Sequence, residues 1–554
     1  MRTILITGAS GSIAAPLIPL LARTGKLCCR LFLRDSAKNR DLFSRWQRDG
    51  LNVEPFWGNL CDADSCLKAV AGCELILHCG ALIPPATLHH PDLAWQTNIG
   101  GTRNILAAIK AQPNSQKIRL IYTGTVAQYG YRNYLHPWGR VGDPLLPGPY
   151  EVYGSSKVRA ERLVIESSLE RWVSLRLSPI LYDGMILRNM GDGLIFQTPL
   201  NTCLEWTTTR CTTDLISKII TAELADELPP SFWRRVYNVG GGAPSRTTYY
   251  ETLAAGLKLI GSSPKYFFRP HWFATRNFSG MWMIDSDILI KQFDFTAGEC
   301  FTDFFNALKK KLWYYKVGFP LRRLIRSRIL RPLAFGYDAP AHWAEHGPPE
   351  RAEAFYGPGK TYAELPRFWH QFPLLCENRN PATGVFLDYH QFKSDVDLRA
   401  RGYYLGHGYD DTRPDAEIEL PDLISAAEFR GGACLAETMT KGDMYTELPW
   451  RCHQGHEFSA SPYLILRAGH WCPVCCQPEP WNFDELARHI PFFAQVWYDT
   501  HHPDERNFYP QGSARDITAA RAGAKQKKIT GWVGRLAAYF KDPSNRKNKK
   551  RKKE

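Results

Sequence analysis

The chain has 554 residues, a formal net charge of +14 at pH 7, and 44% hydrophobic and 13% aromatic residues, which is the composition of a globular protein with room for two or more domains. No apolar run reaches the roughly 18 residues that would span a bilayer, and the first residues already form a predicted strand, so we expect a soluble, cytoplasmic protein without a signal peptide. Fifteen cysteines in such a chain favour free thiols and a metal site over a disulfide framework.

The first predicted strand, residues 2–7, runs into the glycine-rich turn GASGSIA and then into an apolar helix that ends near residue 23. Gly8 and Gly11 let the backbone approach a pyrophosphate, and the start of the helix offers free N–H groups. Small Ala14 permits close packing of the helix on the strand. This segment therefore predicts a dinucleotide site, although Pro19 should cost about 3 kcal/mol or kink the helix.

The end of the second predicted strand bears on the choice of cofactor. An acidic residue at this place favours the ribose of NAD, and a basic residue favours the phosphate of NADP. Here Arg34 directly precedes Asp35. Both charges are present, and Arg34 could equally be a solvated strand end, so the sequence predicts NAD(P) with NADP slightly favoured over NAD.

A candidate catalytic group lies further along the chain. Thr125 ends a predicted strand, and Tyr153 and Lys157 are one helical turn apart, so the ammonium can lie beside the phenol and lower its pKa from about 10. We expect Tyr153 to exchange a proton with a substrate hydroxyl or carbonyl and Thr125 to hydrogen-bond the same oxygen. The alternative is an exposed helix pair with no role.

Residues 1–311 resemble the extended short-chain dehydrogenase/reductase superfamily, of the NAD-dependent epimerase/dehydratase type. The family's motifs appear in order as Thr7, Gly8, Gly11 and Ala14; Gly58, Asn59, Leu60 and Asp62; Leu75 to Ala81; Asn98, Gly101, Thr102 and Asn104; Thr125, Tyr153 and Lys157; and Arg176 with Pro179. Two positions depart from the family, because Asn59 replaces an aspartate and Thr125 replaces a serine.

The resemblance implies an α/β fold, a Rossmann doubly wound parallel sheet with a small substrate-binding subdomain, and a homodimer. It also implies a set of cofactor-binding residues: Gly8, Ser10, Gly11, Ser12, Ile13, Arg34, Asn59, Leu60, Cys79, Gly80, Ala81, Asn98, Tyr153, Lys157 and Pro179.

The expected activity is NAD(P)-dependent oxidoreduction or epimerisation of a hydroxyl or ketone substrate, with sugars and nucleotide sugars among the candidates. Dehydration is disfavoured because Val126 and Ala127 stand where dehydratases of the family carry acidic residues. Aromatic residues in the second half of this region are expected to be core rather than a substrate wall: Trp206, Trp233, Phe267, Phe268, Trp272 and Trp282.

Residues 312–420 are predicted to be a connecting region. Arginines and leucines at helical spacing predict a basic amphipathic helix over about 321–331, ended by Pro332. It could bind an acidic membrane surface or a partner, but packing across the reductase with its arginines in water is favoured. The rest of this region is rich in proline, glycine and charge, and residues 388–411 are expected to be irregular.

Cys452, His456, Cys472 and Cys475 have the spacing that lets four N/S donors converge on zinc. With all four positions filled by protein, the site is expected to be structural. A redox CxxC, or Cys476 in place of Cys475, remain alternatives. The motifs GGACLAE at 431–437, WRCHQGH and GHWCPVC resemble a treble-clef zinc-ribbon family, so residues 421–528 are expected to form an irregular zinc-binding α+β module.

Residues 529–554 are predicted to form an amphipathic helix followed by a Lys/Arg-rich tail at 546–554. The tail could contact nucleic acid or an anionic membrane surface, although a solvated tail is the commoner outcome. A rival hypothesis for the whole chain is therefore an NADP-sensing scaffold, or a nucleic-acid-associated protein that uses the zinc module and the tail.

Overall fold

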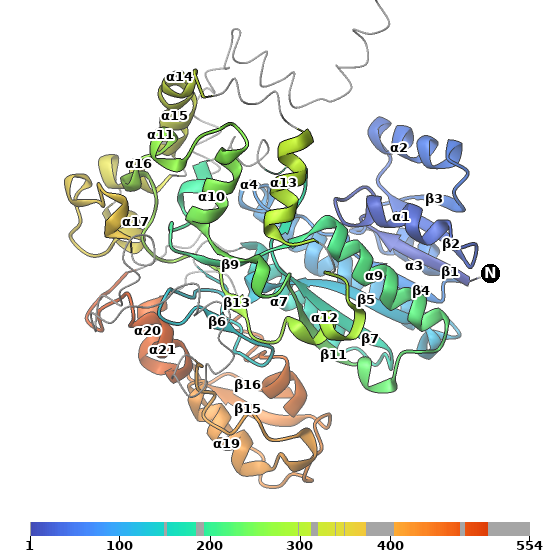
Figure 1. Ribbon diagram of the computed structural model, residues 1–554. Coiled ribbons are helices and arrows are strands. Elements are labelled where there is room, and N and C mark those ends of the chain that lie inside the picture. Colours follow the sequence, from blue (N-terminus) through green and yellow to red (C-terminus); the bar gives the residue numbers. More distant parts are fainter. Residues whose placement is uncertain are drawn as a thin grey trace, which may run out of the picture.

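The structure is a computed structural model that describes residues 2–507 apart from 149–151, 184, 186–192, 297–298, 312–318, 338, 348, 373–403 and 477–481. Its centre is a seven-stranded parallel sheet in the order β11-β7-β5-β4-β1-β2-β3 (Figure 1). The strands are β1 (Arg2–Thr7), β2 (Leu27–Leu33), β3 (Val53–Trp57), β4 (Leu75–His78), β5 (Arg119–Thr125), β7 (Trp172–Leu177) and β11 (Arg235–Val239). The strand order reverses direction between β1 and β4, and ligands bind at such a switch point in doubly wound folds. The predicted α/β parallel sheet is confirmed.

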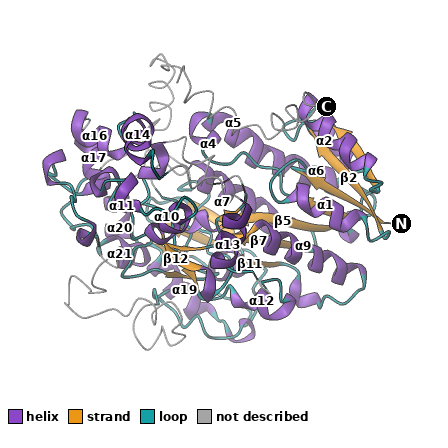
Figure 2. Cartoon of the chain, turned by 45° about the horizontal axis from the view of Figure 1, so that its top comes forward, coloured by secondary structure: helices purple, strands orange, loops and turns teal. Residues whose placement is uncertain are grey.

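Helices cover both faces of the sheet (Figure 2). One face packs on α1 (Ala14–Ala22), α2 (Ala37–Arg48), α9 (Thr209–Leu224) and α12 (Asp287–Phe293), and the other packs on α3 (Ala63–Val70), α6 (Gly101–Lys110) and α7 (Val152–Ile165). Pro19 lies inside α1 without ending it. Short helices α4 (Ala86–His89) and α5 (Pro91–Trp95) precede α6.

A smaller subdomain is formed mainly by residues that follow β7, together with β6, which precedes it. It contains the strand pairs β8 (Ile180–Leu181) with β10 (Thr207–Thr208), β9 (Cys203–Glu205) with β12 (Arg246–Thr248), and β6 (Trp138–Gly139) with β13 (Trp282–Met283). Its helices are α10 (Tyr249–Lys258), α11 (Pro264–Phe267) and α13 (Phe301–Lys311). All six tryptophan and phenylalanine residues predicted to be core are at most 7% exposed, which confirms that prediction.

The predicted basic helix is longer than expected. It runs through α14 (Arg322–Ile325), a π-helical turn η9 (Arg326–Leu330) and α15 (Arg331–Ala334), so the prediction that Pro332 ends it is wrong. The physical reason is that the π turn closes just before the proline, with the Arg331 N–H donating to the Arg326 carbonyl. Pro332 then falls in the first turn of α15, where a missing N–H costs little.

The region after this helix is also more regular than expected. Helices α16 (Pro340–His346) and α17 (Pro349–Tyr356) each begin at a proline. They pack through Trp343 and Phe355, whose ring centroids are 5.3 Å apart. Most of the stretch predicted to be irregular, residues 388–403, lies outside the described residues.

The C-terminal module consists of α19 (Leu420–Phe429), the antiparallel strands β14 (Gly432–Cys434), β15 (Leu448–Cys452) and β16 (Glu457–Ala460), a π-helical turn η13 (Tyr463–Arg467), and helices α20 (Phe483–His489) and α21 (Pro491–Trp497). It lies beside the parallel sheet at the bottom of Figure 1. Leu423, Leu464 and Ile465 belong to the same buried cluster as Tyr122 of β5 and Trp172 of β7. The module and the sheet therefore share one hydrophobic core.

No helix in the described part of the chain is long and apolar enough to cross a membrane. The amphipathic helix predicted near residues 529–540 and the basic tail at 546–554 lie outside the described residues.

Candidate functional site

The glycine-rich turn lies at the carboxyl end of β1, against the end of β4. Gly8 has φ +65°, and the Gly11 N–H donates to the Gly8 carbonyl at 2.8 Å. A Cβ on Gly8 would lie 2.9 Å from backbone atoms of Cys79 and Gly80, so only glycine fits. Ser10, Gly11 and Ser12 are exposed, and Ile13 is half-buried at the start of α1. The turn thus presents open backbone at the switch point of the sheet, as a pyrophosphate site requires.

The segment after β4 packs closely on this turn. The Gly80 N–H donates to Thr7 Oγ1 at 2.9 Å, and a Cβ on Gly80 would lie 2.5 Å from Leu60 Cδ1. Leu60 is held by the Asn104 amide, which donates to its carbonyl at 2.8 Å. Cys79 and Ala81 flank Gly80 and are half-buried. These residues therefore form one wall beside the glycine-rich turn.

Asn98 braces this wall rather than facing solvent. It is buried, accepts from the Leu82 N–H at 2.7 Å and donates to the Leu82 carbonyl at 3.1 Å. Its amide also donates to Ser156 Oγ of α7 at 2.8 Å. Asn98 consequently fixes the segment after β4 to the helix that carries Tyr153 and Lys157.

Two predicted cofactor contacts lie at strand ends. Asn59 is exposed after β3, and its side-chain oxygen accepts from the Cys61 N–H at 3.1 Å. Pro179 follows β7 at the start of the segment that enters the subdomain, and its carbonyl accepts from the Thr207 N–H at 3.1 Å.

The charges at the end of β2 are unequally engaged. Asp35 receives two hydrogen bonds from the Arg40 guanidinium, both at 2.7 Å. Arg34 is exposed, and no carboxylate among the described residues pairs with it. The carboxylate of Asp35 is therefore paired with Arg40, whereas the guanidinium of Arg34 has no carboxylate partner among the described residues.

Thr125, Tyr153 and Lys157 lie on two elements that pack together, because α7 lies against β5. Thr125 is the last residue of β5 and is 8% exposed. Its Oγ1 accepts from the Ala127 N–H at 3.3 Å, which leaves the hydroxyl proton to be donated. Tyr153 is half-buried in the first turn of α7. Its phenol acts electrostatically on Tyr122, which belongs to β5, the strand that ends at Thr125.

Lys157 is 3% exposed, and its Nζ lies 4.0 Å from the centroid of the Tyr122 ring. Burial lowers the pKa of Lys157 to about 7, while the negative charge of Glu161 acts against this shift. A lysine in this state can hold or release a proton near neutral pH. Burial also raises the pKa of the Cys79 thiol to about 12, so Cys79 stays neutral.

A network of buried polar side chains holds α7 in place. The sequence motifs did not predict this network. Glu161 is fully buried, and its carboxylate receives hydrogen bonds from Arg176 Nη2 at 2.6 Å and Ser174 Oγ at 2.6 Å. His470 Nε2 lies 3.0 Å from the same carboxylate. The four-residue spacing of Lys157 and Glu161 was a readable signal for a charge pair. Contacts with His470 and Tyr122 had no local signal.

The predicted metal ligands converge at the turn between β15 and β16 and at the CPVC segment. The ligand atoms of Cys452, His456, Cys472 and Cys475 all lie within 4.8 Å of one another. Cys452 Sγ lies 3.6 Å from Cys475 Sγ and 3.4 Å from His456 Nδ1, and Cys472 Sγ lies 3.7 Å from His456 Nδ1. Hydrogen bonds from Cys475 lower the pKa of the Cys472 thiol to about 5.

Cys476 lies outside this cluster. Its thiol is half-buried, its pKa is raised to about 11 by desolvation, and it does not take the place of Cys475. Of the two alternatives that the sequence left open, Cys475 is the residue that joins Cys452, His456 and Cys472.

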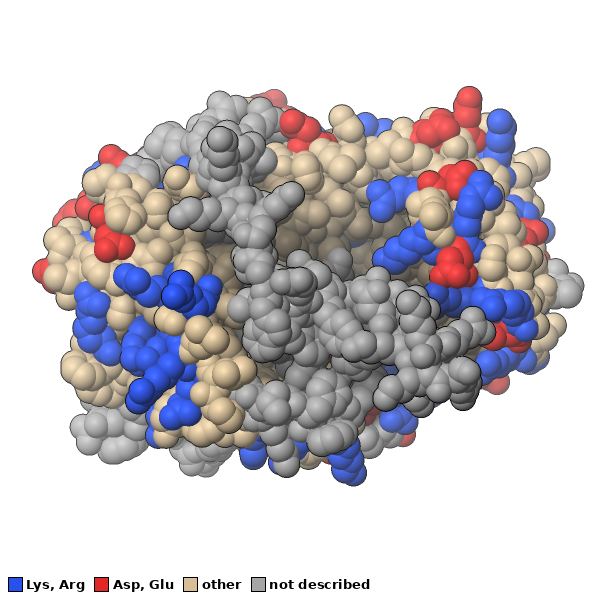
Figure 3. Space-filling model, turned by 90° about the horizontal axis from the view of Figure 1, so that it is seen from above, with Lys and Arg blue, Asp and Glu red and all other residues tan. Residues whose placement is uncertain are grey.

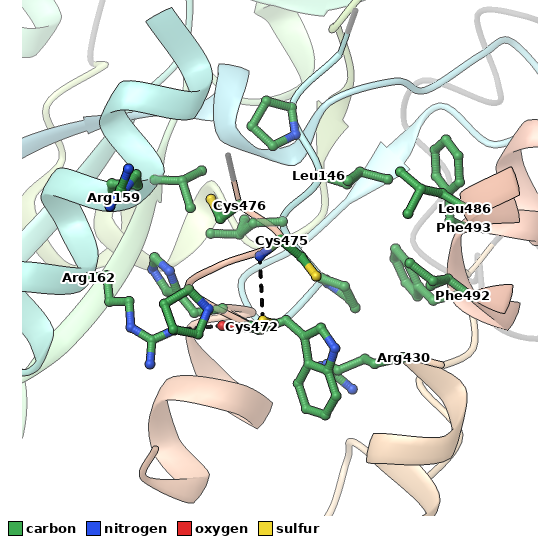
Figure 4. Close-up of a pocket in the computed structure, with 18 of the residues that line it drawn as sticks. Leu146, Arg159, Arg162, Arg430, Cys472, Cys475, Cys476, Leu486, Phe492 and Phe493 are labelled. Carbon is green, nitrogen blue, oxygen red and sulfur yellow. Dashed lines mark hydrogen bonds between the residues drawn. The ribbon is translucent and has the colours of Figure 1, made fainter. Parts of the chain in front are cut away.

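A cavity of about 220 Å³ separates the cluster from α7 (Figure 4). Arg159 and Arg162 of α7 lie on one side, and Leu486 of α20 with Phe492 and Phe493 of α21 lie on the other. Arg162 is engaged by Glu166 at 2.7 Å and by the Trp471 carbonyl at 2.5 Å. Neither Lys157 nor Gly8 lines this cavity, so the cavity is separate from the predicted dinucleotide site.

Comparison with known proteins identifies the N-terminal part. Residues 4–180 match the NAD dependent epimerase/dehydratase family. Over 119 residues the chain is 27% identical to D-erythronate dehydrogenase of Haemophilus influenzae, a match that covers 21% of this chain and 32% of that protein. Over 123 residues it is 28% identical to 3 beta-hydroxysteroid dehydrogenase type 7 of Homo sapiens, again covering 21% of this chain and 32% of that protein. The chain thus spans about a third of the length of these two relatives.

Among solved structures, dTDP-glucose 4,6-dehydratase of Bacillus anthracis in complex with NAD is similar at 18% identity and a TM-score of 0.45, covering 57% of this chain and 97% of that chain. The family match covers the segment that contains the glycine-rich turn and the switch point of the parallel sheet, so the N-terminal part of this chain is similar to NAD-dependent epimerase/dehydratase domains.

Proposed function

We propose that the N-terminal domain catalyses NAD(P)-dependent oxidoreduction or epimerisation at a hydroxyl or ketone carbon of a sugar or nucleotide sugar. The observation that carries the proposal is the position of Lys157. It is buried on the ring of Tyr122, in the strand that ends at Thr125, and lies one helical turn from Tyr153. Burial of a lysine costs desolvation free energy, and a lysine whose pKa lies near 7 is suited to handling a proton at neutral pH.

In the proposed mechanism, Tyr153 exchanges a proton with the substrate oxygen, and Thr125 donates its hydroxyl proton to the same oxygen. Because the Ala127 N–H already occupies Thr125 Oγ1, the rotation of this hydroxyl is restricted. Lys157 supplies positive charge, which favours the phenolate form of Tyr153. A nicotinamide, when bound, supplies the hydride acceptor or donor.

The residues around the turn suit a dinucleotide. Gly8 is a position that a Cβ would fill, and Ser10 and Ser12 are exposed in the turn just before α1. We further propose that NADP is preferred to NAD, because Arg34 is available for a phosphate whereas Arg40 engages Asp35.

The identity of the reaction is supported by the absence of an acid beside Thr125. Val126 and Ala127 follow it directly, so the second proton-transfer group that elimination of water needs is not at this position. Two relatives of the domain are dehydrogenases by name, which supports hydride transfer as the central step.

We propose that Cys452, His456, Cys472 and Cys475 bind a structural zinc ion. A tetrahedral site with Zn–S bonds of about 2.3 Å and Zn–N bonds of about 2.1 Å has ligand atoms about 3.6–3.8 Å apart. Four separations between the ligand atoms, 3.4, 3.4, 3.6 and 3.7 Å, are close to this spacing. With four protein ligands the metal would have no open position for substrate, so its contribution would be to stability.

The proposal is tested with the purified full chain. Titration calorimetry with NAD and NADP measures cofactor binding, and a panel of UDP-sugars, dTDP-glucose and hydroxy acids is assayed by absorbance of the reduced cofactor and by chromatography of the sugar products. Tyr153→Phe should keep cofactor binding and lose about 10²- to 10⁴-fold in turnover. Tyr498→Phe, at the end of α21, serves as the matched control. Failure to bind either nucleotide, or full turnover by Tyr153→Phe, would refute the proposal.

A further inference from the structure

Basic side chains gather on one surface of the subdomain, formed by α11, the turn that follows it and the helical run from α14 to α15. We call this surface the basic face; its residues are Lys265, Arg269, Arg322, Arg323, Arg326, Arg328, Arg331 and Arg367. Each is exposed or half-buried. Figure 3 shows Lys and Arg side chains clustered here, at the left of the view, without acidic side chains among them.

The positive charges of the basic face are not neutralised. Within the described residues none of them forms an ion pair with a carboxylate, and the side chains of Arg322 and Arg326 donate only to the carbonyls of Phe319, at 3.1 Å, and Tyr266, at 3.3 Å. Burial and the like charges of Arg269, Arg323 and Arg322 lower the pKa of Arg326. Mutual repulsion of this kind is relieved when an anion binds, so the basic face is an anion-binding surface.

Apolar side chains lie exposed within this charge. Tyr266 is 40% exposed, Leu321 is 41% exposed and Leu324 is 44% exposed. Leu321 and Leu324 are three residues apart and so lie on one side of the helix. The helical run is anchored further along, because Leu330 and Ala334 are fully buried in the subdomain core. The helix is therefore fixed to the protein body and presents leucines between arginines to the outside.

An open hollow of about 270 Å³ lies in the basic face. Arg269, Arg326 and Arg331 line it together with the aromatic side chains of Trp272, Phe335 and Tyr362. Glu345 acts electrostatically on Tyr362 of this lining, and its carboxylate lies 3.5 Å from His346. Guanidinium groups bind phosphate oxygens in paired hydrogen bonds, so a hollow with this lining suits a phosphate group.

We propose that the basic face docks the protein on a bilayer surface that contains anionic phospholipids. In this arrangement Leu321 and Leu324 enter the interfacial layer, and the arginines of the hollow bind head-group phosphates. A nucleic acid would use the same cations, but it offers no apolar layer for leucines that lie between them. The attachment is peripheral, and it is independent of the hydride chemistry proposed for the N-terminal domain.

The proposal is tested by co-sedimentation of the full chain with vesicles of phosphatidylcholine, and with vesicles in which roughly a third of the lipid is phosphatidylserine. Wild-type protein should bind only the anionic vesicles. The double variant Arg322→Glu with Arg326→Glu should weaken vesicle binding by at least about tenfold, because each basic residue near an anionic membrane surface adds its own share of the binding free energy. Lys110→Glu with Lys117→Glu, two exposed lysines elsewhere, makes the same change in net charge and should bind as wild type.

A second pair of variants separates lipid from nucleic acid. Leu321→Gln with Leu324→Gln keeps every charge and should still weaken vesicle binding severalfold, because apolar insertion is lost. Both positions are exposed, and an unchanged melting temperature confirms that the variants fold. The proposal is overturned if the arginine double variant binds anionic vesicles like wild type, or if removal of residues 546–554 alone abolishes vesicle binding. It is also overturned if a single-stranded oligonucleotide binds the wild-type protein as tightly as the vesicles do and the leucine variant binds both ligands like wild type.

Discussion

The guanidinium of Arg176, in the parallel sheet, donates a hydrogen bond of 2.6 Å to the carbonyl of Ala468, 292 residues later in the chain. Both side-chain partners of this arginine are themselves buried: Glu161 of α7 and the Tyr129 hydroxyl, which accepts at 2.8 Å. The C-terminal module therefore supplies part of the polar lining beneath the candidate catalytic helix. The module and the parallel sheet thus pack as one unit.

This relationship predicts that Arg176→Met destabilises the whole protein. Glu161 would be left as a buried charge without its strongest partner, which costs about 3–5 kcal/mol. Because the sheet and the module share one core, differential scanning calorimetry should show one transition at a lower temperature. Arg45→Met, which breaks an exposed pair with Asp41, should change stability by under about 0.5 kcal/mol. Two separate transitions, with the first domain unaffected, would contradict a shared core.

Lys157 predicts a pH dependence of stability. Its pKa is about 7 in the folded state and near 10.5 in the unfolded chain, so between these values the unfolded state binds more protons. The cost of burying Lys157 is therefore full below pH 7 and is relieved as the pH rises. Relative to Lys157→Met, wild-type protein should gain on the order of 2 kcal/mol in free energy of unfolding between pH 7 and about pH 9. Urea titration measures this difference.

The exposed lysine of Lys110→Met is the control for that experiment and should give a difference that is flat with pH. A flat difference for Lys157→Met as well would mean that Lys157 keeps an ordinary pKa. The proposed role as a charge that titrates near neutral pH would then fail.

Gly8→Ala should abolish cofactor binding and destabilise the fold. The new Cβ would lie 2.9 Å from the backbone of Cys79 and Gly80, at a residue with φ +65°. We expect a loss of roughly 2–4 kcal/mol from strain and overpacking together. Gly25→Ala has nearly the same φ, +68°, and nothing within 4 Å, so it should cost only about 1 kcal/mol and leave binding intact. Equal effects of the two variants would show that packing at Gly8 is irrelevant.

Arg34→Ala should lower the affinity for NADP by about tenfold and leave the affinity for NAD unchanged, because one charge-assisted contact with a phosphate is lost. Lys38→Ala, at an exposed lysine of α2, is the control. Calorimetric titration of both nucleotides decides between the outcomes. A parallel loss of affinity for NAD would mean that Arg34 does not read the phosphate.

Cys472→Ser should remove bound zinc and lower the melting temperature. Elemental analysis of the wild-type protein should give about one zinc per chain, and a chelator should reproduce the effect of the variant, since binding of a structural metal contributes to folding free energy. Cys61→Ser, at an exposed cysteine outside the cluster, should retain the metal. Wild-type protein that purifies without metal and does not change on addition of zinc would exclude a zinc site.

The sequence predicted those parts of the molecule whose chemistry is local. The turn at Gly8 and the CPVC segment could be read because glycine and cysteine are required there by backbone geometry and by metal ligation, whatever surrounds them. Helical spacing likewise predicted that Tyr153 and Lys157 share a face. The sequence assigned Cys475 as the fourth ligand and left Cys476 as an alternative, and the structure brings Cys475 into the cluster.

Contacts between distant segments could not be predicted from the sequence. Nothing near Glu161 indicates His470, and nothing near Asn98 indicates that its amide joins Leu82 to Ser156. The end of the basic helix was mispredicted at Pro332 because a π turn, which has no clear sequence signature, moved the proline into a first helical turn.

The shared core also has a consequence during synthesis. Ribosomes translate about 5–20 residues per second, so the 292 residues between Arg176 and Ala468 take roughly 15–60 s to produce. Throughout that interval the outer surface of Trp172 and the Arg176 side chain have no cover from the segment that will later enclose them. We therefore expect the first domain to complete its folding only after the segment around Ala468 has been synthesised.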